Sequence, residues 1–134
     1  MSSVLADTHA VVWYLHAPAE LSRVAQEALD AAASHRAHVC VSAISLVEIV
    51  YLEEKGRIGP LCQRELDRAL RDQEASRLLL VPVDADIAQA VGHIPRDIVP
   101  DMPDRIIAAT ALHLGLPLVT KDERIRSLPL ETIW

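Results

Sequence analysis

Val4-Leu5-Ala6-Asp7 places an acidic residue directly after a short apolar run near the start of the chain. A short run of consecutive apolar residues is typical of a strand that is buried on both faces of a parallel sheet. The residues from His9 to His16 have the pattern of a helix, and Pro18 helps to end it. The chain therefore opens with a strand and a helix, and Asp7 lies at the junction between them.

The same alternation continues to the C-terminus. Further strands are predicted at 39–42, 78–83, 116–120 and 132–134. Helices are predicted at about 22–32, 44–55, 62–75, 84–91 and 104–114, with a short helical turn after Asp122. Alternating strands and helices predict an α/β fold with a mostly parallel sheet and helices on both faces. The length of 134 residues, without repeats or a linker-like segment, fits one domain over 1–134.

Composition limits the class of protein. Hydrophobic residues make up 51% of the chain, but aromatic residues only 3% with no Phe, so the core must be aliphatic. No apolar run approaches the ~20 residues that span a bilayer, and the N-terminus lacks the basic region of a signal peptide. Cys40 and Cys62 are not spaced as zinc ligands, which fits a reducing cytoplasm. The net charge of −6 argues against a general nucleic-acid coat protein, but it does not exclude an enzyme with a local basic rim.

Four acidic residues are expected to meet at one edge of the sheet. Asp7 follows the first strand and Asp122 follows the fourth, while Asp104 begins a helix that runs back across the sheet. Glu48 lies about one turn into the helix after the second strand, within reach of the same edge. Ligands bind at the carboxyl ends of the strands in open parallel sheets, so this arrangement predicts a functional site.

Clustered carboxylates repel one another unless a divalent cation or a proton is held among them. Oxygen ligands suit Mg²⁺ or Mn²⁺, and such an ion suits phosphodiester hydrolysis by an activated water. The structural alternative is that Asp7 is a turn residue, Asp104 a helix cap and Asp122 a helix starter. Glu48 fits this alternative least, because it lies in the apolar segment Val47-Glu48-Ile49.

Four segments of the chain, in order, resemble the signature segments of PIN-domain proteins, and most closely the VapC-type toxins of toxin–antitoxin pairs. They are 5–10 (LADTHA), 42–49 (SAISLVEI), 101–110 (DMPDRIIAAT) and 116–122 (LPLVTKD). The segment before Asp104 departs from the family pattern, since Val99-Pro100-Asp101-Met102 lacks the usual His and has its proline displaced.

The resemblance implies a three-layer sandwich with a five-stranded sheet, and an Mg²⁺- or Mn²⁺-dependent endoribonuclease that is the toxin of a type II toxin–antitoxin system. It also implies a homodimer and inhibition by a VapB-type antitoxin. The residues that match the metal-binding carboxylates of the family are Asp7, Glu48, Asp104 and Asp122. Asp101 matches a further acid of the family, and Thr8 and Thr120 are candidates for holding a carboxylate or water.

Other residues leave alternatives open. Arg105 either contacts substrate phosphate or pairs with a nearby carboxylate. Trp13, Tyr14 and Tyr51 either stack on bases, pack in the core or line a groove for a partner peptide. Two further functions remain as alternatives: a catalytically inert PIN-fold binding module, which would not bind Mn²⁺, and a receiver-like phospho-acceptor domain.

Overall fold

The computed structural model describes residues 3–34 and 36–134, and its centre is a five-stranded sheet. The strands are β1 (Val4–Ala6), β2 (Val39–Ser42), β3 (Leu78–Val81), β4 (Leu118–Val119) and β5 (Thr132–Ile133). They lie in the order β3-β2-β1-β4-β5, and each neighbouring pair is parallel. The predicted α/β fold with a parallel sheet is therefore confirmed.

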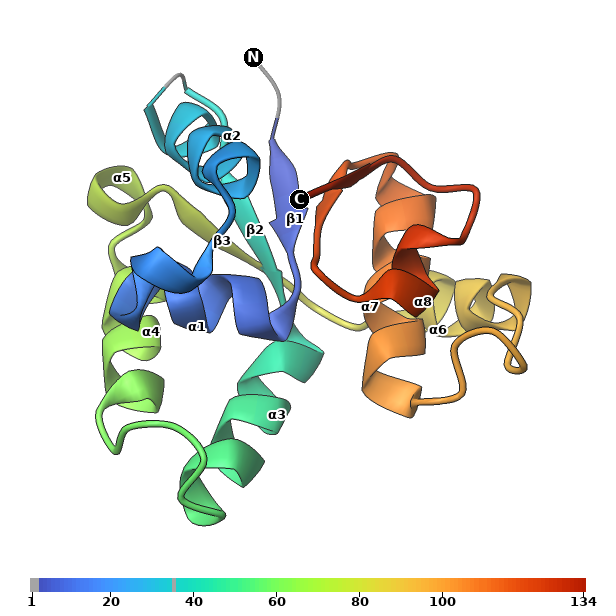
Figure 1. The fold of residues 1–134 in the computed structure, drawn as a ribbon, viewed down its shortest axis with the longest axis horizontal. Coiled ribbons are helices and arrows are strands. Elements are labelled where there is room, and N and C mark those ends of the chain that lie inside the picture. The colour runs from blue at the N-terminus through green and yellow to red at the C-terminus, as the bar shows by residue number, and fades with distance from the viewer. Residues whose placement is uncertain (1–2, 35) are drawn as a thin grey trace.

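Helices cover both faces of this sheet (Figure 1). They are α1 (Thr8–His16), α2 (Arg23–Ser34), α3 (Ala43–Glu54), α4 (Cys62–Arg71), α5 (Gln73–Ser76), α6 (Ala85–Ala90), α7 (Met102–Leu114) and α8 (Glu123–Arg126). Two 3-10 turns, η1 (Pro18–Glu20) and η2 (Val91–His93), connect them. No described helix combines the length and the apolar character that crossing a membrane requires.

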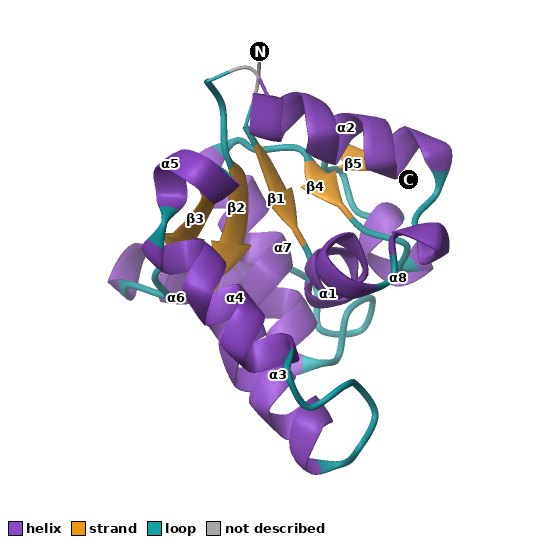
Figure 2. Cartoon of the chain, turned by 90° about the vertical axis from the view of Figure 1, so that its left-hand side faces the viewer, coloured by secondary structure: helices purple, strands orange, loops and turns teal. Residues whose placement is uncertain are grey.

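The alternation of side chains along the strands builds two aliphatic cores. Val4 and Ala6 face the core that contains buried residues of α1, α2 and α4, while Leu5 between them faces the core of α6, α7 and α8. This is the period of two that strand geometry imposes. Figure 2 shows the sheet between these helix layers.

Several predicted boundaries were wrong. The helix predicted at 62–75 is two helices, because the chain leaves helical geometry at Asp72. The strand predicted at 78–83 ends at Val81, before Pro82, which has no N–H to donate to a neighbouring strand. The last helix before β4 begins at Met102, and Asp101 rather than Asp104 is its N-cap. Val24 in α2, which the apolar spacing of the residues around it predicts to be buried, is 55% exposed.

The strand order turns at β1, because the chain adds β2 and β3 on one side of it and β4 and β5 on the other. A crevice forms at such a switch point, outside the carboxyl ends of the strands. The segments after β1 and β4 are therefore the expected site of ligand binding. The order also differs from the 2-1-3-4-5 order of receiver domains, which overturns the receiver-like alternative.

Candidate active site

A cavity of about 320 Å³ opens at the carboxyl ends of β1 and β4. Its lining residues are Asp7, Thr8, His9, Trp13, Glu48, Asp104, Lys121 and Asp122. The four acids predicted to meet thus lie around one hollow, although they come from four separate segments of the chain.

Asp7 is the most buried of these acids, with 8% of its surface exposed. One carboxylate oxygen accepts a hydrogen bond from the backbone N–H of Ala10, at 2.8 Å, and so caps α1. The other accepts a hydrogen bond from the Thr120 hydroxyl, whose oxygen also accepts the backbone N–H of Asp122, at 3.1 Å. Thr120 therefore connects the ends of β1 and β4 and fixes two acids of the site.

Glu48 reaches the cavity from the second turn of α3 and is half-buried. Its Oε1 accepts a hydrogen bond from the Thr8 hydroxyl. The Thr8 oxygen also hydrogen-bonds the hydroxyl of Ser45, at 2.9 Å. These two hydroxyls orient the Glu48 carboxylate, as hydrogen-bonding neighbours of metal ligands commonly do.

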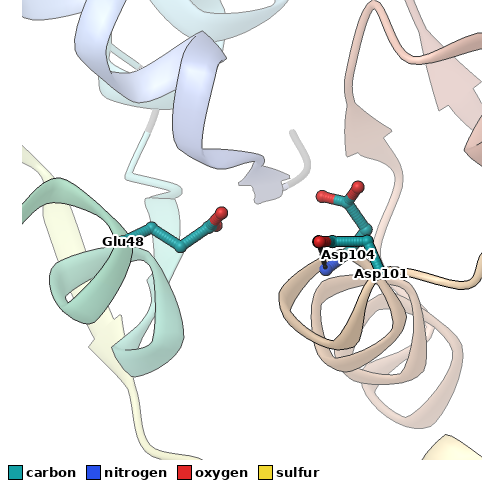
Figure 3. Close-up of side chains that lie close together, drawn as sticks. All are labelled: Glu48, Asp101 and Asp104. Atoms are coloured by element: carbon teal, nitrogen blue, oxygen red, sulfur yellow. Dashed lines mark hydrogen bonds between the residues drawn. The ribbon is translucent and has the colours of Figure 1, made fainter. Parts of the chain in front are cut away.

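Asp101 and Asp104 come from the start of α7, across the cavity from α3 (Figure 3). The Asp101 carboxylate caps this helix by accepting the backbone N–H of Asp104, at 3.2 Å. Glu48, Asp101 and Asp104 each present a carboxylate oxygen, and these oxygens lie within 4.8 Å of one another. Among the described residues, these three are the one group of acidic, histidine or cysteine side chains close enough together to hold a metal ion, and Asp101 belongs to it.

Burial and neighbouring negative charge raise the pKa values of Asp7, Glu48 and Asp104. Burial, followed by the negative charges of Asp101, Asp122, Glu48 and Asp7, raises the pKa of Asp104 from its ordinary value of 3.8 to about 7. Burial is also the largest cause that raises the pKa of Asp7 and of Glu48, and the Thr120 and Thr8 hydrogen bonds oppose it. The cluster therefore favours a proton or a cation in the cavity.

Three helices direct their N-termini at this cluster. Asp7 caps α1, Asp101 caps α7 and Asp122 caps α8. The unpaired N–H groups at a helix N-terminus favour negative charge, typically by about 0.3–1 kcal/mol per site. Capping thus offsets part of the repulsion. The structural role suggested for Asp7 and Asp122 therefore coexists with their convergence, whereas the cap suggested at Asp104 is supplied by Asp101.

The donor set fits Mg²⁺ or Mn²⁺. Glu48, Asp101 and Asp104 offer oxygen ligands only, at a mutual spacing that one small cation can bridge, and Asp7 and Asp122 add carboxylates on the β1–β4 side. Zinc would instead favour nitrogen and sulfur ligands, and neither cysteine lines the cavity.

Arg105 lies beside the cluster in sequence, but its guanidinium donates to the backbone carbonyls of Ile94, at 2.8 Å, and Val91, at 3.0 Å. It thereby ties η2 to α7. The carboxylate pairing considered for this residue is not the one in the structure, and its contact with substrate phosphate stays a prediction.

Sequence reasoning missed part of the cavity wall. His9 and Lys121 line it, although neither was singled out as a site residue. Trp13 also lines the cavity, and both Trp13 and Tyr14 pack against the hydrophobic core. Tyr51 is instead 58% exposed. Their closeness in sequence to predicted site residues could have identified them, since His9 follows Asp7 by two residues and Lys121 precedes Asp122.

The comparisons with known proteins agree with this geometry. The PIN domain family matches residues 4–130. A relative, Ribonuclease VapC22 of Mycobacterium tuberculosis, is 35% identical over 127 residues, which covers 95% of this chain and 92% of the relative. The chain belongs to the PIN-domain family, as its four sequence segments predicted.

Solved structures share the fold. VapBC2 from Rickettsia felis, solved with a DNA fragment from its promoter, matches with a TM-score of 0.71 and 21% identity, over 98% of this chain and 97% of that chain. DNA-bound VapBC from Salmonella typhimurium matches with a TM-score of 0.67 and 23% identity, over 98% and 97% of the two chains. At this level of identity the likeness establishes the three-layer architecture.

Proposed function

We propose that this protein is a metal-dependent endoribonuclease and the toxin of a type II toxin–antitoxin system, built as one domain that acts in the cytoplasm. The observation that carries the proposal is the convergence of Asp7, Glu48, Asp104 and Asp122 on one cavity at the sheet's switch point, with a carboxylate oxygen of Asp101 within 4.8 Å of those of Glu48 and Asp104. The 35% identity to a ribonuclease over nearly the full chain supports RNA as the substrate.

Glu48, Asp101 and Asp104 would hold Mg²⁺ or Mn²⁺, with Asp7 and Asp122 facing the same hollow. The bound ion supplies charge neutralisation for a phosphodiester and lowers the pKa of water. The acids would position such an ion, and the hydroxyls of Thr8 and Thr120 hold the Glu48 and Asp7 carboxylates in place through hydrogen bonds. A protein nucleophile is not needed for this chemistry.

A protein partner is supported by an apolar groove of about 370 Å³ that adjoins the acids. Its lining includes Val47, Tyr51 and Met102, which are exposed, together with Glu48. A VapB-type antitoxin that covers this groove would also screen the acids from RNA. The relation to VapBC assemblies supports such a partner, and we extend the proposal to a homodimer of the toxin.

The decisive test is RNA cleavage by purified protein with Mg²⁺ or Mn²⁺. Wild type should cut total cellular RNA at sites that end-mapping identifies, and excess chelator should stop it. Asp104→Asn and Asp7→Asn should lose cleavage while circular dichroism shows a preserved fold. The matched control is Asp84→Asn, which changes an exposed aspartate that caps α6 and should leave cleavage intact.

Two outcomes would contradict the proposal. Full cleavage by Asp104→Asn, or by wild type in excess chelator, would remove the metal site from the mechanism. A wild-type protein that cuts nothing and shows no heat of binding with millimolar Mn²⁺ would support the inert binding module instead.

A further inference from the structure

Trp13 lines the acidic cavity and packs against Trp134, the other tryptophan of the chain. The rings of Trp13 and Trp134 lie 5.9 Å apart between centroids, with 54° between their planes. His9 packs against Trp13 from the cavity side of α1, at 5.6 Å and 47°. His9 and Trp13 also line the cavity that holds the acids.

This aromatic group is not needed to fill the core. The two core clusters consist of buried aliphatic residues and cysteines, and the chain has no Phe. Trp13 and Trp134 pack against one of these clusters from its edge and are half-buried. Trp13 is therefore held by contacts on the core side and contributes the rest of its ring to the cavity wall, an arrangement that costs little entropy when a ligand stacks on it.

Lys121 adds a positive charge at the same place. Its ammonium lies 5.7 Å from the centre of the Trp13 ring, a distance typical of a cation–π contact. Among the described residues that line the cavity, Lys121 is the one Lys or Arg. Within a wall of carboxylates, it is the group that attracts a phosphate.

We propose that Trp13, His9 and Lys121 form a subsite for one unpaired nucleotide beside the scissile phosphodiester, with the base against Trp13 and a phosphate on Lys121. This inference rests on the proposed ribonuclease function and adds the residues of this chain that would hold a nucleotide next to the cleaved bond, which must be unpaired to reach them. A base inside a duplex is stacked on its neighbours and cannot reach an aromatic side chain. Stacking on tryptophan tolerates every base, so the subsite selects for unpaired structure more than for sequence.

The test uses Trp13 as its own reporter. In Asp104→Asn protein that also carries Trp134→Phe, Trp13 is the remaining tryptophan, and cleavage does not interfere. A short single-stranded oligoribonucleotide, added with millimolar Mg²⁺, should quench its fluorescence. A set of oligonucleotides, each abasic at one position, should contain one whose affinity falls roughly 5- to 150-fold and whose quenching is lost.

Substitution of Trp13 completes a double-mutant cycle. Trp13→Leu should weaken binding of the intact oligonucleotide by a similar factor, measured by the anisotropy of a labelled RNA. The Trp13→Leu protein should then bind the intact oligonucleotide and the critical abasic oligonucleotide with equal affinity. Trp13→Phe keeps an aromatic face and should retain part of the base dependence. The measurements with abasic oligonucleotides use protein that retains Trp13, so they remain a valid test even if the Trp13→Leu variant does not fold.

The outcomes separate this inference from the proposed function. If wild type cuts RNA but no abasic position has a Trp13-dependent effect, or if duplex RNA binds as tightly as single-stranded RNA, the subsite is wrong and the nuclease stands. If wild type cuts nothing but one base stacks on Trp13, the nuclease is wrong and the subsite stands. No RNA binding at all overturns the subsite.

Discussion

At the level of single residues, the acids of the cavity differ in how they tolerate charge. Asp7 is the most buried, yet it accepts hydrogen bonds from Ala10 and Thr120 that favour its charged form. Asp104 is partly buried and surrounded by four other acids, and its burial, followed by their negative charges, raises its pKa to about 7. In the metal-free protein, the ionisation of Asp104 therefore opposes folding.

Stability of the metal-free protein should therefore depend on pH through Asp104. Its pKa is higher in the folded state than its ordinary value of 3.8, so its stabilising contribution is present below about pH 4 and is lost as pH rises through about 7. Asp104→Asn removes that loss. In chelator, urea unfolding should find Asp104→Asn more stable than wild type at pH 8 and nearly equal to it at pH 4, and a pH-independent difference would contradict this account.

Thr120 should matter for both stability and metal binding. Thr120→Val keeps the shape but leaves the Asp7 carboxylate and the Asp122 N–H without their shared hydroxyl partner. We expect a loss of about 1–3 kcal/mol in the free energy of unfolding and a drop of roughly 10–100-fold in Mn²⁺ affinity. Urea titration and calorimetry measure the two effects. Thr120→Ser keeps the hydroxyl and should restore most of both.

At the level of elements, the start of α7 determines how the site is built. Asp101 both caps this helix and lies within the tight acid group. Asparagine caps a helix about as well as aspartate, whereas alanine does not. Asp101→Asn should therefore keep the stability of wild type, while Asp101→Ala should lose about 0.5–2 kcal/mol. Thermal unfolding in chelator measures this difference.

The same pair of variants tests the metal role of Asp101. If its carboxylate binds the ion, both variants should weaken Mn²⁺ binding by a similar factor in calorimetry, although only Asp101→Ala is unstable. Asp84→Ala is the control, because it removes an equivalent cap from α6 away from the cavity. Wild-type Mn²⁺ affinity in Asp101→Asn would limit Asp101 to capping.

The sequence predicted elements well where the local signal was strong. Gly115 ends α7 in the left-handed conformation, as glycine after a helix often does. The predicted start of α7 at Asp104 was two residues late, because Pro103 lies in its first turn, where proline is well tolerated. The break at Asp72 has no glycine or proline nearby, so periodicity alone continued the helix through it.

At the level of the whole molecule, the acids could be predicted to meet because a parallel sheet puts the ends of its strands at one edge. The sheet topology alone therefore predicts that residues far apart in the sequence lie close together. No comparable rule predicts that Trp13 and Trp134 lie together. Trp134 reaches Trp13 because β5 lies beside β4, and the position of an edge strand depends on packing that no local pattern encodes.

Overall charge sets the last prediction. The protein has a net charge of −6, so RNA should bind it through few cationic contacts, of which Lys121 is the one inside the cavity. Each phosphate contact with a single strand contributes about −0.7 to the slope of log affinity against log salt concentration. In the Asp104→Asn background, Lys121→Gln should therefore make this slope shallower by about 0.7.

The control for this measurement is Arg71→Gln. Arg71 is an exposed residue at the end of α4 that pairs with Asp67 and does not line the cavity. Because exposed pairs of this kind contribute little to stability, the variant removes the same charge without other effects. An unchanged slope in Arg71→Gln and a shallower one in Lys121→Gln would locate the phosphate contact in the cavity. Equal slopes in the two variants would mean that RNA responds only to overall charge, and would remove Lys121 from the interface.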